Sequence, residues 1–285
     1  MSWMRYLTLL SFRKLNLEWD MYLYRSTSQV KQKDWQERIQ QDFFKYDGCD
    51  YLEKVSDLGI EIRDWDFGED GFERWNPVRQ SDVFQWQWLA ESSGVYSDMD
   101  VLFVQPMSKL VSDWRKSDVL YCLKDGHFPI GFLGSSGRSL FYKEVRDEAL
   151  QTGSTNAYEG VGLHAVNRVL QRKFIDGAVK RRGRWIPESR KVDLKEDEIP
   201  EVLSGAYKNT KFCNLAQTVI YPFTHRDIHR AYSRQLGLRL PENTVAIHWY
   251  AGAKKSQEMN CRLTEQNFMQ YPSLFTWAVE DLLRL

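Results

Sequence analysis

Strand-like and helix-like segments alternate along this chain, and the alternation limits the possible folds more than any other feature. Residues 19–25 and 59–65 alternate apolar and polar side chains as strands do, whereas residues 30–46 have the charged pattern of a helix. Residues 119–124 and 128–136 also resemble strands, and two helix-like segments follow them. Strands that alternate with helices predict an α/β fold with a mostly parallel, Rossmann-like sheet flanked by helices.

The two ends of the chain differ in regularity. Residues 1–16 carry apolar side chains at helical spacing and predict an amphipathic helix that faces the core. The apolar run is shorter than the roughly 20 residues of a membrane span, so a peripheral anchor on a membrane surface is the alternative. The C-terminal half is less regular, with strands predicted at 214–223 and 243–252 and a closing helix at 273–285.

The composition fits one domain over residues 1–285, because 42% apolar residues can bury a sizeable core. Lys and Arg together number 39, as do Asp and Glu, so the net charge of zero gives no reason to expect nucleic acid as a partner. The four cysteines are far apart and form no CxxC pair, which predicts neither a zinc ribbon nor a disulfide framework. Reduced thiols and a cytoplasmic location are expected.

Two aspartates one residue apart, Asp98 and Asp100, interrupt a strand-like segment at residues 95–104. Residues i and i+2 of a strand point to the same face, so both carboxylates would aim at one spot. Carboxylate oxygens suit Mg²⁺ and Mn²⁺, and in open α/β sheets ligands bind beyond the carboxyl ends of strands. The spacing therefore indicates a metal site that could bridge a diphosphate, with ordinary turn residues as the alternative.

The aspartates end a longer pattern that starts at Ser81, the predicted N-cap of a helix running to about Ser92. The pattern consists of Ser81, Asp82, Trp86, Leu89, Gly94, Tyr96, Asp98 and Asp100. In order and spacing it resembles the DXD sugar-binding region of glycosyltransferases with a GT-A fold, above all capsular-polysaccharide and mannosyl-type sugar transferases. Gln85 stands where the family has arginine, and Ser93 where it has the first of two glycines. The resemblance therefore leaves the identity of the transferred sugar open. Residues 5–24, 214–223 and 246–252 show a softer resemblance.

The resemblance implies a GT-A-like fold and a metal-dependent reaction with Mn²⁺ or Mg²⁺. A hexose would pass from a nucleotide diphosphate sugar, UDP- or GDP-hexose, to a hydroxyl of a glycan or lipid-linked acceptor, as in polysaccharide biosynthesis. The resemblance implies a reaction that retains the anomeric configuration, with front-face attack as the expected route, so no strong general base is expected. Asp98 and Asp100 would bind the metal, and Asp98 could instead contact the ribose. The residues implied in donor binding are Ser81, Asp82, Gln85, Tyr96 and Asp98, with Asp82 holding sugar hydroxyls.

The resemblance also divides the chain into a nucleotide-sugar half at about 1–125 and an acceptor half at about 126–285. In the family a strand that contacts the nucleotide base precedes the equivalent of Met4, and the given sequence begins after it. We therefore expect either a sheet without that strand or a start that is truncated or misassigned.

A second set of candidates follows the strand-like segment at 243–252. His248 precedes Gly252, Lys254 and Lys255 with the spacing His-x-x-x-Gly-x-Lys. Some GT-A enzymes carry a related C-terminal His-x-x-Gly-x-x-Lys, in which histidine completes the metal shell and lysine meets the diphosphate. Neutral imidazole is a metal ligand and lysine forms charge-assisted contacts with phosphate, so we interpret His248 as a third metal ligand and the other three as donor-binding. A strand-end histidine bonded to the backbone is the alternative.

Three weaker candidates complete the set. Glu159 precedes two glycines and a helix, and could orient an acceptor hydroxyl as a catalytic residue, or simply favour a helix N-terminus. Trp249 and Trp86 are adjacent to motif residues and could stack on the donor. The basic segment 180–191 is interpreted as a solvated loop, with an anionic lipid-linked acceptor as the functional alternative.

These observations favour a glycosyltransferase, a hexosyltransferase in particular. A noncatalytic nucleotide-sugar-binding protein is the main rival, because Gln85 and the missing strand fit a decayed enzyme. A metal-dependent nuclease would explain the aspartates and the basic segment, but not the helix that precedes Gly94 and Tyr96.

Overall fold

The computed structural model describes residues 1–27, 46–68, 72, 75–110, 114–125, 127–152, 160–182, 198–235 and 237–284, with the backbone alone at 178–182. Its contacts divide the chain into two compact units, each assembled from separate stretches of sequence. The first unit comprises Met1–Arg74, Asp98–Leu110 and Thr218–Leu285, and the second comprises Trp75–Ser97 and Val111–Gln217. The predicted donor and acceptor halves concern function, and they stay a prediction.

The first unit begins with helix α1 (Trp3–Leu15), which confirms the predicted amphipathic helix. The side chain of Ser2 caps its N-terminus by accepting a hydrogen bond from the backbone N–H of Arg5. Arg13 and Lys14 lie in the last turn, where their positive charges interact favourably with the helix dipole.

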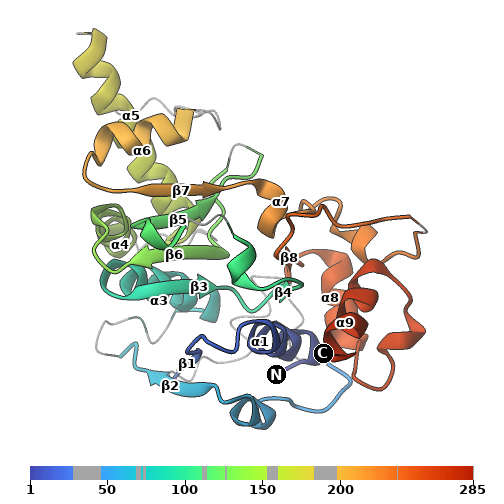
Figure 1. Cartoon of the computed structure of the whole chain (residues 1–285). Coiled ribbons are helices and arrows are strands. Elements are labelled where there is room, and N and C mark those ends of the chain that lie inside the picture. Colours follow the sequence, from blue (N-terminus) through green and yellow to red (C-terminus); the bar gives the residue numbers. More distant parts are fainter. Residues whose placement is uncertain are drawn as a thin grey trace. The chain divides into compact units, whose positions relative to one another are not determined.

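Two small sheets belong to the first unit (Figure 1). Strand β1 (Tyr22–Ser26) pairs in parallel with β2 (Glu61–Trp65), and β4 (Val101–Phe103) pairs antiparallel with β8 (Ala246–His248). Gly59, with a φ of 65°, ends η1 in the left-handed conformation directly before β2. The remaining elements of this unit are η1 (Glu53–Leu58), η2 (Met107–Lys109), η4 (Ile228–Tyr232), α8 (Lys254–Arg262), η5 (Phe268–Gln270) and α9 (Leu274–Arg284).

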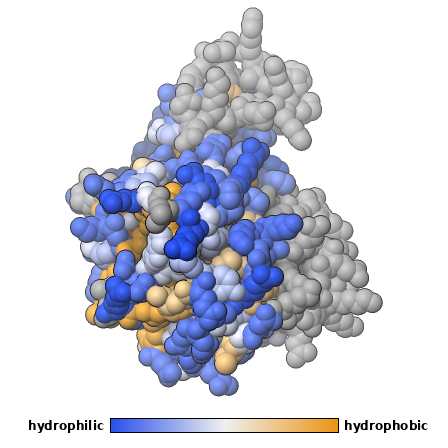
Figure 2. All heavy atoms as spheres, turned by 90° about the vertical axis from the view of Figure 1, so that its right-hand side faces the viewer, coloured by the Kyte–Doolittle hydropathy of each residue, from blue (hydrophilic) through white to orange (hydrophobic). Residues whose placement is uncertain are grey.

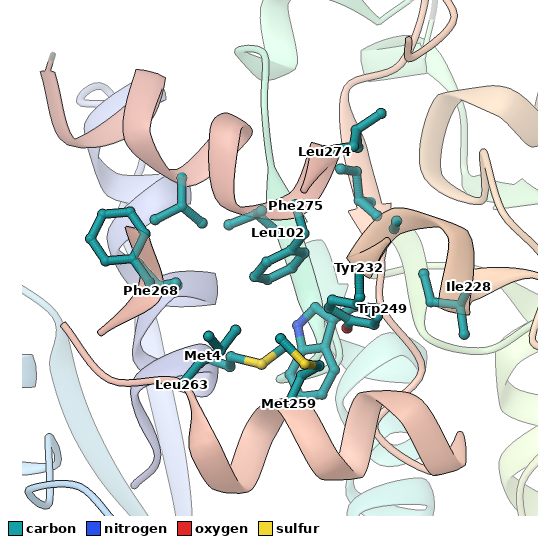
Figure 3. Close-up of a cluster of buried hydrophobic side chains, with 14 of the residues drawn as sticks. Met4, Leu102, Ile228, Tyr232, Trp249, Met259, Leu263, Phe268, Leu274 and Phe275 are labelled. Carbon is teal, nitrogen blue, oxygen red and sulfur yellow. The ribbon is translucent and has the colours of Figure 1, made fainter. Parts of the chain in front are cut away.

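The core of the first unit gathers α1, β4, β8, α8 and α9 around one cluster of apolar side chains (Figure 3). Met4 of α1, Leu102 of β4 and Phe275 of α9 are each 1% exposed or less. Trp249, which follows β8, is also fully buried in this cluster. The segment after β8, which carries several candidate site residues, is therefore fixed to the core at its start.

The second unit contains a four-stranded sheet in the order β3, β6, β5, β7 (Figure 1). Its strands are β3 (Ser93–Ser97), β5 (Val119–Cys122), β6 (Phe132–Ser136) and β7 (Phe212–Leu215). Its helices are α3 (Pro77–Glu91), η3 (Trp114–Lys116), α4 (Leu140–Thr152), α5 (Leu163–Arg182) and α6 (Glu198–Ala206), and α7 (Gln217–Ile220) lies at the boundary with the first unit. α3 packs on α4, α4 on α5, and α5 on α6.

The fold is a mixed α/β fold, and its sheets are small and mixed where the sequence predicted a mostly parallel sheet. β6 runs antiparallel to both β3 and β5, whereas β5 and β7 are parallel. Only residues 123–131 connect β5 to β6, and a parallel pair needs a crossover of about a dozen residues or more. The short connection therefore produces an antiparallel pair.

Several element boundaries also differ from the prediction. α3 begins at Pro77 with Asn76 as its N-cap, so Ser81 lies one turn inside the helix. The segment predicted as a strand at 214–223 divides into the end of β7 and the short helix α7. Helices α6 and α8 were not predicted, and the helix predicted at 30–46 lies almost wholly outside the described residues.

Large apolar side chains on the described surface are few, and hydrophilic residues predominate on the face seen in Figure 2. The most exposed of them is Leu17, at 76%. Among the described helices, none combines the length and the apolar character that crossing a membrane requires.

Candidate metal and donor site

Asp98, Asp100 and His248 form a cluster in the first unit that could hold a metal ion. One ligand atom from each residue lies within 4.8 Å of those of the other two. Asp100 directly precedes β4 and His248 ends β8, and the antiparallel register that pairs Val101 with His248 brings their side chains together. The three residues predicted as metal ligands are therefore neighbours, although the strand segment that was to carry both aspartates is a turn between β3 and β4.

Helix α1 fixes the turn that carries the aspartates. It packs on β4, and the Thr8 hydroxyl donates a hydrogen bond of 3.2 Å to the main-chain oxygen of Met99. Ser11, three residues further along the helix, accepts a hydrogen bond of 3.0 Å from the backbone N–H of Phe103. Residues three apart lie on one face of a helix. Thr8 and Ser11 are buried polar residues within the apolar stripe of α1, and their hydrogen bonds hold the turn and the strand that follows it.

Asp100 is held by the segment that follows β8. Its Oδ2 accepts a hydrogen bond of 2.7 Å from the backbone N–H of Ala251, and its main-chain oxygen accepts one of 2.8 Å from Trp249. Its Oδ1 lies 3.3 Å from Nε2 of His248, yet it has no hydrogen-bond partner among the described residues. Asp100 is only 9% exposed, and leaving a buried carboxylate oxygen without a donor is costly. A divalent cation between Asp100 and His248 would remove that cost, so the residues fit a metal ion.

His248 is positioned through its other ring nitrogen. The backbone N–H of Tyr250 donates to Nδ1 at 3.3 Å, and the two rings lie 4.4 Å apart between centroids. A neutral imidazole that accepts at Nδ1 carries its proton on Nε2, which lies 3.3 Å from Oδ1 of Asp100 but is not aligned for a hydrogen bond with it. Binding a cation at Nε2 therefore requires the proton to leave that nitrogen, which couples metal binding to proton movement.

Tyr250 has an unusual backbone conformation that sequence reasoning missed. Its φ is 52°, in the left-handed region that non-glycine residues rarely adopt. The conformation turns the chain so that the next N–H, that of Ala251, reaches Asp100. The Tyr250 hydroxyl donates to the carbonyl of Phe223 at 2.9 Å, which helps to keep the turn in place. Strained backbone of this kind often occurs at functional sites, and nothing in the sequence of the segment signals it.

Arg5 supplies positive charge to the cluster from one turn before Thr8 on α1. Burial lowers the pKa of its guanidinium, and the charges of Asp100 and Asp98 oppose that effect. An arginine stays protonated over the whole physiological range, so it offsets part of the repulsion between the two carboxylates. Arg5 also lines a cavity of about 380 Å³ in the first unit, which leaves room for a ligand beside α1. Sequence analysis did not select Arg5.

The predicted phosphate-binding residues lie at the start of α8. The helix begins at Lys254, and its N-cap residue Ala253 provides no side-chain cap. Lys254 is exposed, whereas Lys255 pairs with Glu258 at 3.0 Å. A helix N-terminus without a side-chain cap has free N–H groups, and together with two lysines it favours an anion. Gly252, which is exposed, accepts a hydrogen bond from Gln257 with its carbonyl.

The two tryptophans considered for donor stacking are both buried. Trp249 and Trp86 are 0% exposed. The Trp86 indole N–H donates a hydrogen bond of 2.8 Å to the carbonyl of Val161, and its ring stacks on Tyr142. In this structure neither ring has a face open to a sugar, because each buries its large apolar surface in the core of its unit.

The remaining donor candidates lie in the second unit on α3 and β3. Ser81 and Tyr96 share a hydrogen bond of 3.0 Å between their hydroxyls. Asp82 is 9% exposed. Burial lowers the pKa of the Arg79 guanidinium, and the negative charge of Asp82 opposes that effect. The amide of Gln85 donates to the carbonyl of Ile130, and its Oε1 is buried without a partner among the described residues.

Two predicted features lie outside the described residues. Glu159 is one of them, so its role in orienting an acceptor is an open prediction. Of the basic segment 180–191, only the backbone of residues 180–182 is described, as the end of α5.

Comparison with known proteins agrees with the pattern around the aspartates. Residues 14–119 match the family described as "Glycosyltransferase sugar-binding region containing DXD motif", and this stretch includes every residue from Ser81 to Asp100. The match confirms the predicted resemblance to DXD-containing glycosyltransferases, and it supports the prediction of an enzyme.

A solved structure titled "PaToxG Glycosyltransferase" is also similar to this chain. The two are 14% identical with a TM-score of 0.40, and the likeness covers 73% of this chain and 80% of that chain. No match was found among curated proteins.

Proposed function

We propose that this protein is a metal-dependent hexosyltransferase of the GT-A type, which takes a hexose from UDP- or GDP-hexose. The observation that carries the proposal is the buried Oδ1 of Asp100, which has no hydrogen-bond partner among the described residues and lies 3.3 Å from Nε2 of His248. A cation satisfies both groups, and metal-dependent transferases use one to neutralise a diphosphate. The family match supports a sugar substrate.

Asp98, Asp100 and His248 would hold the ion. Two carboxylates suit Mn²⁺ and Mg²⁺ alike, whereas the imidazole nitrogen favours Mn²⁺, because Mg²⁺ takes oxygen ligands almost exclusively. When bound, the ion supplies positive charge that stabilises the leaving diphosphate. Arg5 offsets carboxylate charge on the α1 side of the cluster.

The start of α8 would bind the leaving diphosphate. Lys254 and Lys255 provide positive side chains, and the uncapped N–H groups of the helix provide donors. Gly252 precedes the helix and lets the backbone approach the phosphates closely. The bond between the anomeric carbon and the diphosphate oxygen breaks while the acceptor oxygen bonds to the same face of that carbon. Attack on the same face retains the anomeric configuration. The acceptor proton passes to the departing phosphate oxygen, so no strong general base is needed.

The resemblance implies that residues of α3 and β3 bind the sugar. Asp82 would accept hydrogen bonds from sugar hydroxyls, and the hydrogen-bonded pair of Ser81 and Tyr96 would offer a further hydroxyl. The side chain of Gln85 is buried, so Gln85 would contribute indirectly, by holding the main chain at Ile130 with its hydrogen bond. Glu159 would orient the acceptor hydroxyl.

A glycan or lipid-linked acceptor is the proposed second substrate, which would give the enzyme a place in polysaccharide biosynthesis at the cytoplasmic side of a membrane. The support is the resemblance in sequence of residues 81–100 to capsular-polysaccharide transferases. A lipid-linked acceptor that is anionic would be attracted to the basic segment 180–191. Neutralising that segment should therefore weaken acceptor use and leave donor hydrolysis intact. Equal loss of both activities would reject this acceptor.

Asp100→Asn tests the proposed function. The amide cannot supply the second carboxylate, so Mn²⁺-dependent hydrolysis of the donor should fall by about a hundredfold or more. Asp281→Asn, at an exposed position of α9, is the matched control and should hydrolyse the donor at the normal rate. Release of UDP or GDP from a panel of nucleotide sugars provides the measurement. Undiminished turnover in Asp100→Asn would contradict the assignment.

A further inference from the structure

The turn Gly160–Gly162, directly before α5, is fastened to its surroundings in the second unit. The Val161 carbonyl accepts the indole N–H of Trp86 at 2.8 Å, and the Gly160 carbonyl accepts a hydrogen bond of 2.9 Å from the Arg168 guanidinium. The Gly162 carbonyl accepts from the backbone N–H of Ala165 at 3.0 Å, which starts the first turn of α5. The backbone of the turn therefore has little freedom to move.

Gly162 lies directly against the carboxylate of Asp82. A Cβ atom added to Gly162 would come within 2.8 Å of the carboxylate carbon of Asp82 and 2.9 Å of Cδ1 of Ile130. Both distances are shorter than ordinary contacts between such atoms, so the carboxylate would have to move. The contact also places the negative charge beside the N-terminus of a 20-residue helix, where the helix dipole stabilises it.

Ile130 connects this contact with Gln85. The carbonyl of Ile130 accepts the amide of Gln85, which is one turn further along α3 from Asp82, while the Ile130 side chain reaches Gly162. The residue that stands in place of the family's arginine therefore fixes one wall of the space around the Asp82 carboxylate, and Gly162 fixes another.

We propose that Gly162 is a specificity-determining position of this transferase, where the absence of a side chain lets Asp82 adopt the position in which it binds sugar hydroxyls. The inference rests on the proposed function, in which Asp82 contacts the sugar. Gly162 itself is a positioning residue, because it acts through Asp82. A side chain at this position displaces the carboxylate and thereby changes which hexose is accepted.

Gly162→Ala tests the inference, with Gly205→Ala as the matched control. A Cβ at Gly205, in α6 of the same unit, has nothing within 4 Å. Gly162→Ala should weaken binding of the nucleotide sugar about tenfold, as expected when a hydrogen bond to a charged group is lost. Binding of UDP or GDP, which lack the sugar, should stay unchanged within about twofold. The ratio of kcat/KM for two donors that differ in one hydroxyl configuration should shift in Gly162→Ala and not in Gly205→Ala.

A double variant keeps the test decisive if Gly162→Ala folds poorly. Asp82→Ala removes the carboxylate that the new Cβ meets, although Cδ1 of Ile130 must still move. Asp82→Ala/Gly162→Ala should therefore bind the nucleotide sugar as well as Asp82→Ala does. Unequal affinities of these two variants would overturn the inference, as would a Gly162→Ala protein with the donor preference of Gly205→Ala. If the unmodified protein hydrolyses no nucleotide sugar with Mn²⁺, the proposed function itself fails, and this inference fails with it.

Discussion

At the scale of single residues, the position of Asp100 depends on the segment 249–251, and that segment depends on Ser256. The Ser256 hydroxyl donates a hydrogen bond to the carbonyl of Trp249, whose backbone N–H binds the main-chain oxygen of Asp100. Tyr232 in turn donates its hydroxyl to Ser256 at 3.3 Å. Burial raises the pKa of the Tyr232 hydroxyl, so Tyr232 stays protonated and remains a donor.

Ser256→Ala should therefore destabilise the protein by about 2 kcal/mol, because it leaves the Trp249 carbonyl and the Tyr232 hydroxyl buried without partners. Ser56→Ala is the matched control, since Ser56 is exposed and its hydroxyl donates to the local carbonyl of Glu53, and it should change stability by less than about 0.5 kcal/mol. Urea denaturation measures both free energies of unfolding. Equal stability of the two variants would show that Ser256 does not support the segment.

The sequence could predict the Asp98–Asp100–His248 cluster and could not predict what holds it. Two aspartates at i and i+2, and a histidine at the end of a strand, are local patterns with a chemical meaning. The positive φ of Tyr250 is not local, because it depends on the core contacts of Trp249 and on the carbonyl of Phe223 far away in the chain. Trp249 shows the same limit, since adjacency to a motif does not tell which side of the backbone faces the core.

At the scale of elements, Glu148 clamps α4 to α5. It is 5% exposed and accepts hydrogen bonds from Arg168 and Arg172. Burial alone would raise the pKa of Glu148, but the two arginines outweigh it and hold the pKa below its usual value of 4.5. Arg168 also binds the carbonyl of Gly160, so the clamp extends to the turn beside Asp82.

Glu148→Gln should lower the free energy of unfolding by about 2 kcal/mol at neutral pH, because hydrogen bonds to a charged group are lost. A carboxylate whose pKa is lowered on folding contributes stability above its unfolded-state pKa and loses it as pH falls through its folded-state pKa. The difference between the parent protein and Glu148→Gln should therefore be constant at neutral pH and shrink below pH 4.5. Glu91→Gln, which breaks the exposed pair of Glu91 with Arg146, should cost less than about 0.5 kcal/mol. A pH-independent difference would contradict this account of Glu148.

Element type followed from periodicity more reliably than sheet topology did. The patterns at 1–16 and 273–285 predicted helices that the structure contains as α1 and α9, since a buried stripe is a local property. Strand direction is different, because it depends on the length of the connection and on the partner that a distant segment supplies. β4 pairs with β8 from near the other end of the sequence, and no local pattern indicates that register.

At the scale of the whole molecule, the candidate metal ligands belong to one of two units. Asp98, Asp100 and His248 all lie in the first unit, and the strands that carry or flank them, β4 and β8, pair within it. A ligand that binds the folded state and not the unfolded chain stabilises the protein by mass action, by about 2.7 kcal/mol at a concentration one hundred times its Kd. Metal binding can therefore be followed without any substrate.

Mn²⁺ should raise the unfolding midpoint of the protein, and a chelator should restore the original value. Amide hydrogen exchange should slow most at Ala251 and in β4 and β8, because the ion ties the Asp100 carboxylate, which binds the Ala251 N–H, to the end of β8. Asp100→Asn should remove the shift, whereas Asp281→Asn should keep it. A midpoint that rises equally in Asp100→Asn would mean that the ion binds elsewhere, and then the buried oxygen of Asp100 would need a different partner.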